Sequence, residues 1–85
     1  MGAALKLLIK LSQGNLKNVR FAEFQKLLNA LGFELVRVSG SHHIYTHPEV
    51  SEIVNIQNVG SEAKPYQIRQ VLTLVELYGL QLEKR

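Results

Sequence analysis

Between Gly32 and Pro65 the chain contains three short segments rich in β-branched and aromatic residues, and only brief turns separate them. They are 33–38 ("FELVRV"), 42–47 ("HHIYTH") and 52–57 ("EIVNIQ"). Such segments, bounded by Gly, Ser and Pro, are typical of strands. Parallel neighbours need a crossover of about a dozen residues, whereas antiparallel strands can be joined by a tight hairpin turn. The spacing therefore predicts an antiparallel three-stranded meander.

Two helical patterns flank this meander. From Asn18 onward apolar residues recur every three or four positions, and Gly32 follows where a helix C-cap favours a left-handed residue. After a polar loop, Pro65 suits the first position of a second helix, because its missing N–H needs no partner there. The first apolar stripe is Phe21, Phe24, Leu27, Leu28 and Leu31; the second is Ile68, Val71, Leu72, Val75 and Tyr78, and Gly79 ends that helix.

The order of these elements predicts an α+β domain, α-β-β-β-α, with two helices on one face of the sheet. The other face of an antiparallel sheet can stay open to solvent or to a ligand. We place this domain at residues 17–85 and treat residues 1–16 as a separate N-terminal amphipathic helix.

The N-terminal segment is too polar to cross a membrane. Lys6 and Lys10 interrupt its apolar residues, so it lacks both a signal-peptide core and a membrane span. We expect it to dock on the core and to cover Leu74 and Leu77, which widen the apolar face of the last helix. A membrane-surface helix, a homodimer contact and a frayed end are the alternatives. Its predicted apolar face contains Ala4, Leu5, Leu8, Ile9 and Ser12.

Charge and cysteine content narrow the classes of partner. The 85 residues carry 10 Lys and Arg against 7 Asp and Glu, a net charge of +3. This balance favours an anionic partner such as nucleic acid. The chain has no cysteine, which excludes disulfides and thiolate metal sites. A cysteine-free chain agrees with a reducing compartment, and we expect a cytoplasmic protein.

The only three histidines, His42, His43 and His47, lie within six residues. On a helix, His43 and His47 would face one metal ion. On a strand they share a face but stand about 13 Å apart, too far for one ion. No cysteine is present to complete a ligand set, so we predict no metal site. For His47, next to Pro48 at a strand end, we favour a structural role.

His42 is the candidate for acid–base chemistry. A histidine acts as general acid or base because its pKa lies near neutrality, provided that its backbone is held in place. His42 leaves a Gly-Ser turn and enters a strand, with Gly40 expected to leave room beside it. Ser41 can hydrogen-bond a phosphate or the imidazole ring. A half-exposed strand histidine without catalytic function is the alternative.

The stretch "LLNALGFELVRVSGSHHIYTHP" resembles the HicA toxins of bacterial toxin–antitoxin pairs. The shared pattern is a helix ending in Gly32-Phe33, a strand carrying Arg37, then Gly40-Ser41-His42 and an aromatic residue, Tyr45. The later "EIVNIQ" and "KPYQIRQVLTLVELYGL" also follow the order of that family, so the resemblance covers about residues 18–80.

This resemblance implies a double-stranded-RNA-binding-domain-like fold and a metal-independent ribonuclease that cleaves mRNA without a cofactor. It also implies neutralisation by a partner antitoxin, HicB, and one required histidine, which carries over to His42. Many family members have a second histidine where this chain has Gln57. Glutamine can bind a base or a phosphate but cannot shuttle protons. His43 points to the opposite face of a regular strand from His42.

Further residues are candidates for RNA contacts. Arg37, Lys64 and Arg69 suit phosphates, and Tyr45 or Tyr66 can stack on a base. Each has a structural alternative: solvent exposure, a helix start or the core. Two other functions fit the same fold, because sites and not folds determine function. They are a non-catalytic RNA-binding module and an interaction protein that uses the open sheet.

Overall fold

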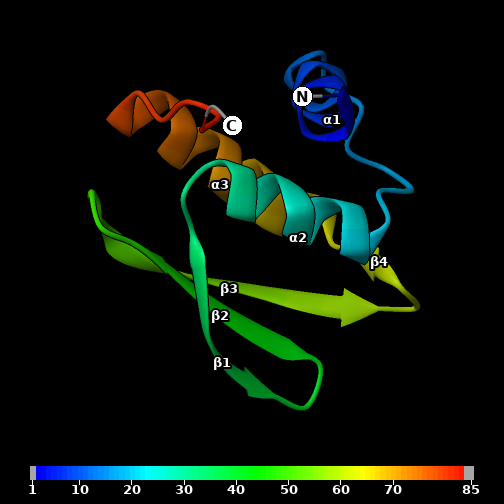
Figure 1. The fold of residues 1–85 in the computed structure, drawn as a ribbon. Coiled ribbons are helices and arrows are strands. Elements are labelled where there is room, and N and C mark those ends of the chain that lie inside the picture. Colours follow the sequence, from blue (N-terminus) through cyan, green and yellow to red (C-terminus); the bar gives the residue numbers. More distant parts are fainter. Residues whose placement is uncertain (1, 84–85) are drawn as a thin grey trace.

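The computed structural model describes residues 2–83 and has the predicted α+β architecture, with the helices on one face of an antiparallel sheet (Figure 1). Its element order is compatible with a double-stranded-RNA-binding-domain-like fold. None of its helices is long and apolar enough to span a membrane. The elements are α1 (Gly2–Ser12), α2 (Phe21–Ala30), β1 (Glu34–Ser39), β2 (His42–His47), β3 (Val50–Val59), β4 (Glu62–Ala63) and α3 (Pro65–Tyr78).

The sheet has four strands in the order β1-β2-β3-β4, one more than the sequence predicts. β3 is longer than expected and turns back at Gly60 and Ser61, so that Val59 pairs with Glu62. Both turn residues have positive φ, 59° and 67°, as a type I′ hairpin turn requires. The prediction missed β4 because a strand of two residues is too short to show a periodicity of its own.

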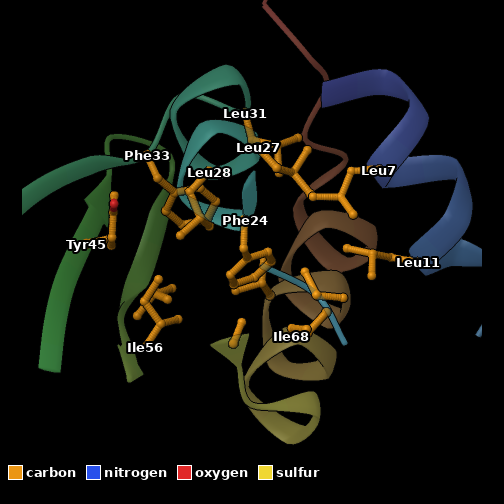
Figure 2. Packing of buried hydrophobic residues seen from close by; sticks show 14 of the residues in the cluster. Leu7, Leu11, Phe24, Leu27, Leu28, Leu31, Phe33, Tyr45, Ile56 and Ile68 are labelled. Carbon is orange, nitrogen blue, oxygen red and sulfur yellow. The ribbon is translucent and has the colours of Figure 1, made fainter. Parts of the chain in front are cut away.

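One continuous core fills the space between the helices and the inner face of the sheet (Figure 2). Phe24 and Leu28 of α2, Ile68 of α3 and Ile56 of β3 are fully buried there. Burial of such side chains contributes about 1.5–3 kcal/mol each. The apolar faces of the helices and of the sheet therefore pack together in one layer. The outer face of the sheet remains uncovered (Figure 1).

Glycines end two helices as predicted. Gly32 follows α2 with φ of 97°, and the Phe33 N–H donates to the Leu28 carbonyl at 3.0 Å. Gly79 follows α3 in the left-handed region with φ of 62°. A Cβ on Gly32 would come within 2.8 Å of His47 Nε2, so that position is fixed by close approach as well as by backbone conformation.

Helix α1 docks on the core, but through a different face from the predicted one. Leu7 and Leu11 are buried, whereas Leu5 and Ile9 are 42% and 48% exposed. The segment contains two overlapping apolar stripes at helical spacing, and only packing against α2 and α3 selects between them. The buried and half-buried stripe is Ala4, Leu7, Leu8 and Leu11.

The predicted cover for Leu74 and Leu77 is wrong. Leu77 is 67% exposed, and Leu74 lines a surface hollow with Glu52 of β3. Helix α1 instead lies along the opposite side of α3, where Leu72 and Val75 line a hollow with Leu8, Leu11 and Leu16. Helix α1 therefore lies beside the Leu72 and Val75 side of the apolar stripe of α3 and leaves the Leu74 and Leu77 side uncovered.

Replacing Leu11 by Ala tests whether α1 belongs to the folding unit. Because Leu11 is 1% exposed, we expect Leu11→Ala to lower the free energy of unfolding by about 2–5 kcal/mol. Ile9→Ala, on the exposed side of the same helix, is the matched control and should change it by less than about 0.5 kcal/mol. Urea denaturation measures both. Equal small effects would mean that α1 folds apart from the rest of the chain.

Candidate active site on the open face of the sheet

His42 is the first residue of β2 and follows a two-residue turn, Gly40–Ser41, that pairs Ser39 with His42. Gly40 has φ of 59°, and a Cβ there would meet nothing within 4 Å. The turn therefore needs glycine for its backbone conformation, and not for the space beside His42 that the sequence analysis expected. The His42 side chain is exposed. It points to the opposite face from His43, whose partner Ile56 is buried under the helices, so His42 lies on the face that no helix covers.

Asn55 holds the His42 ring. The His42 Nδ1 and the Asn55 Oδ1 are 3.1 Å apart. Because Oδ1 only accepts, Nδ1 carries the hydrogen, and Nε2 of the neutral ring is left as a free acceptor. Asn55 is opposite Ile44 on β3 and so is the diagonal neighbour of His42. Asn55 could not be identified from the sequence, because the alternation of β3 indicates the face of Asn55 but not the register of β3 against β2.

The other two histidines have structural partners. His43 lies on the opposite face from His42, as predicted, with its ring 4.8 Å from that of Phe21. His47 Nε2 donates to the Leu31 carbonyl at 2.9 Å, and its Nδ1 accepts the Glu49 N–H at 3.0 Å. His47 thus links the end of α2 to the β2–β3 turn. Within residues 2–83 no group of three or more His, Cys, Asp or Glu is placed to hold a metal ion.

Gln57 is the cross-strand partner of His42. Its backbone N–H donates to the Gln67 Oε1 at 2.7 Å. Gln67 belongs to the first turn of α3 and is buried. This bond ties the start of α3 to β3 directly beside the His42 strand. Gln67 was not identified from the sequence, where it resembles any polar residue of a helix start.

The start of α3 brings two of the predicted RNA-contact residues to this place. Tyr66 is 57% exposed, and its hydroxyl is 3.5 Å from Gln67 Nε2. Lys64 Nζ lies 5.7 Å from the centre of the Tyr66 ring, a cation–π distance. Tyr66 therefore presents an aromatic ring beside Gln57 that a base can stack on, with a positive charge next to it.

Arg37 and Ser41 flank His42 on the other side. Arg37 pairs with Ile44, which gives it the same sheet face as His42. Diagonal neighbours on a sheet are about 7–8 Å apart, within reach of a long side chain. Ser41 lies in the turn, where its carbonyl accepts the Asn58 N–H at 2.9 Å. The structure thus gathers Arg37, Ser41, Lys64 and Tyr66 around the His42 end of the sheet.

Two predicted residues lie elsewhere. Tyr45 is 1% exposed, and its hydroxyl accepts a hydrogen bond from Gln25 Nε2 at 3.0 Å. Of the two alternatives for Tyr45, the structure shows the core position, which leaves no ring face for a base. Arg69 faces α1 and the α1–α2 connection, where it lines hollows with Lys10 and Lys17. It is therefore on the helical side of the molecule, apart from the sheet face of His42.

Burial gives Tyr45 a testable pH dependence. Desolvation raises its pKa above 10.0, although the bond from Gln25 opposes this shift. A raised pKa in the folded state means that the stability is complete below about pH 10 and is lost as the pH rises further. We expect Tyr45→Phe to flatten this loss above about pH 10. Thermal unfolding across that range measures it, and the exposed-ring variant Tyr66→Phe, which should keep the wild-type slope, is the control.

Comparison with known proteins identifies the family. The model of the HicA toxin of bacterial toxin–antitoxin systems matches residues 21–77, about two thirds of the chain. No curated protein and no solved structure matches. The matched part runs from the first residue of α2 to near the end of α3 and contains His42, Asn55 and Gln67. The chain therefore belongs to the HicA family of toxins of bacterial toxin–antitoxin systems.

Proposed function

We propose that this toxin is a ribonuclease that cleaves mRNA without a metal ion, with His42 as its general acid–base group. The observation that carries the proposal is the His42 ring, exposed on an open sheet face and held at Nδ1 by Asn55. Membership of the HicA family supports a toxin role. A HicB-like antitoxin in the cytoplasm is the partner that this family implies.

The proposed step is attack by the ribose 2′-OH on the adjacent phosphorus. His42 Nε2 takes the 2′ proton as the O2′–P bond forms and the P–O5′ bond breaks, which leaves a 2′,3′-cyclic phosphate. The departing O5′ takes a proton from water, and the imidazolium then returns its proton to solvent. Such acid–base assistance is worth about 10²–10⁴ in rate. The Asn55 oxygen stabilises the imidazolium because it accepts from Nδ1–H in both protonation states.

The surrounding residues supply charge and positioning. Arg37, on the same sheet face, is suited to the developing negative charge on the phosphorane oxygens. Tyr66 stacks on a base next to the cleaved phosphate. Lys64 balances the negative charge of that phosphate. Gln57 takes the place of a second histidine and donates hydrogen bonds from its side-chain amide without proton transfer. The mechanism consequently requires one histidine only.

A non-catalytic RNA-binding module is the second candidate, and Gln57 is the observation in its favour. Glutamine can hydrogen-bond RNA but cannot transfer a proton. RNA binding is therefore possible at this site, whereas cleavage would depend on His42 alone. The same basic and aromatic residues would then hold RNA by its backbone and stacked bases. The two functions differ in one respect, the effect of losing His42.

His42→Ala separates these functions. We expect the variant to abolish growth arrest and to lower the rate of RNA cleavage by about 10²–10⁴, because it removes the proposed general acid–base group. Growth after induced expression and the length of total mRNA are the readouts. Ile53→Ala, an exposed residue on the same sheet face, is the control and should remain toxic. Equal RNA binding by wild type and His42→Ala, with no cleavage by either, would favour the binding module.

Substitutions of Asn55 test how His42 is held. Asn55→Ala removes one hydrogen bond, and we expect kcat to fall about 3- to 10-fold. In Asn55→Asp a carboxylate beside Nδ1 favours the charged imidazolium over the neutral ring. A general base must be neutral, so the rise of kcat/KM with pH should move to higher pH. The pH–rate profile is the measurement, and an unchanged profile in Asn55→Asp would show that Asn55 does not act through His42.

A further inference from the structure

Three cationic side chains, two near the N-terminus and one from the last helix, line one hollow on the helical side of the molecule. They are Lys10 from α1, Lys17 from the α1–α2 connection and Arg69 from α3. The hollow has a volume of about 470 Å³. The docking of α1 forms this hollow, because it brings Lys10 and Lys17 next to Arg69 of α3.

The lining of this hollow suits an anion. No Asp or Glu is among the residues that form it, and Asn15 and Asn18 add side-chain amides that can donate hydrogen bonds. Pro65, the first residue of α3, also lines it, and the N-cap residue of that helix makes no side-chain cap. The positive end of the α3 dipole therefore adds to the three charges. Phosphate oxygens are the acceptors that such a combination favours.

The hollow and His42 lie along one side of the molecule. His42 pairs with Gln57, the next residue of β3 pairs with Ala63 of β4, and Pro65 of the hollow follows two residues later. Figure 1 shows the β1–β2 turn, the end of β3, β4 and the α1–α2 connection following one another along this side. A chain bound at His42 can thus continue past the start of α3 toward Lys17 and Arg69.

We propose that the Lys10–Lys17–Arg69 hollow binds a backbone phosphate of the same RNA strand that is cleaved at His42. The inference rests on the proposed ribonuclease function and adds a second contact remote from the reacting phosphate. The longest dimension of the molecule is 31 Å. At about 3.4 Å per stacked nucleotide this length corresponds to about nine nucleotides. An RNA of 15 nucleotides is long enough to reach both places, whereas a dinucleotide contains only the phosphate that is cleaved and has none left for the hollow.

The proposal gives the N-terminal segment a role in substrate binding. Lys10 and Lys17 precede the part of the chain that matches the family model, which begins at residue 21. Arg69 alone comes from the matched part. The hollow therefore lies only partly within the HicA match, and it combines the N-terminal segment with the family domain.

The test uses the full chain with the double substitution Lys10→Gln/Lys17→Gln. The matched control is Lys6→Gln/Lys26→Gln, which removes the same charge from a neighbouring hollow between α1 and α2. Lys10 also lines that hollow, but Lys17 and Arg69 do not. For a 15-nucleotide RNA we expect the first variant to lower kcat/KM about 10-fold, and cleavage of a dinucleotide to be unchanged. The slope of log affinity against log salt should also become shallower by about one unit. The control pair should change these quantities much less.

Binding to the catalytically silenced protein separates this proposal from the ribonuclease proposal. In a His42→Ala background, the Lys10→Gln/Lys17→Gln variant should lose RNA affinity whether or not the parent protein cleaves RNA. Equal losses for the two lysine pairs would show only a general effect of charge and would overturn the site. Unchanged RNA affinity together with weaker binding of the antitoxin would assign the hollow to the protein partner and overturn it as well.

Discussion

The burial of one face of the sheet under α2 and α3 is the constraint on which the rest of this structure depends. Ile56 of β3 and Tyr45 of β2 point inward to meet Phe24 and Ile68, so the alternating residues of the same strands must point outward (Figure 2). His42 is on the outward set. A shift of one residue in β2 would bury His42 and expose Tyr45, so the burial of the core also fixes the position of the candidate active site.

Two hydrogen bonds turn this exposed face into an organised site. Asn55 Oδ1 fixes the ring of His42 and leaves Nε2 free. Gln67 Oε1 accepts the backbone N–H of Gln57 and thereby anchors the first turn of α3, with Tyr66, next to the strand pair that carries His42. Asn55 thus orients the His42 ring on a solvent-accessible sheet face, and Gln67 keeps the start of α3 beside it. The contact from Gln67 is buried, so losing it would leave a backbone N–H without a partner.

The N-terminal helix extends this organisation to the other side of α3. Leu7 and Leu11 join the common core, and this docking places Lys10 beside Arg69. Arg69 was identified from the sequence as a phosphate contact, but the structure removes it from the surroundings of His42. If the hollow binds RNA, substrate recognition in this toxin extends from the sheet to the helical side, along the edge formed by β4 and the start of α3.

Much of the fold was determined by the sequence alone. Periodicity, Gly32, Gly79 and Pro65 place the helices, and the short turns require antiparallel strands, because these features depend on neighbours within a few residues. The Gly40-Ser41-His42 motif likewise marks the candidate histidine locally. Asn55, Gln67 and the buried face of α1 were decided only by tertiary structure. Register between strands, and the choice between two apolar stripes of one helix, depend on contacts between residues that are distant in sequence. Tyr45 shows the same limit: a strand aromatic has equal local propensity for the core and for the surface, and only the packing of α2 over β2 assigns it to the core.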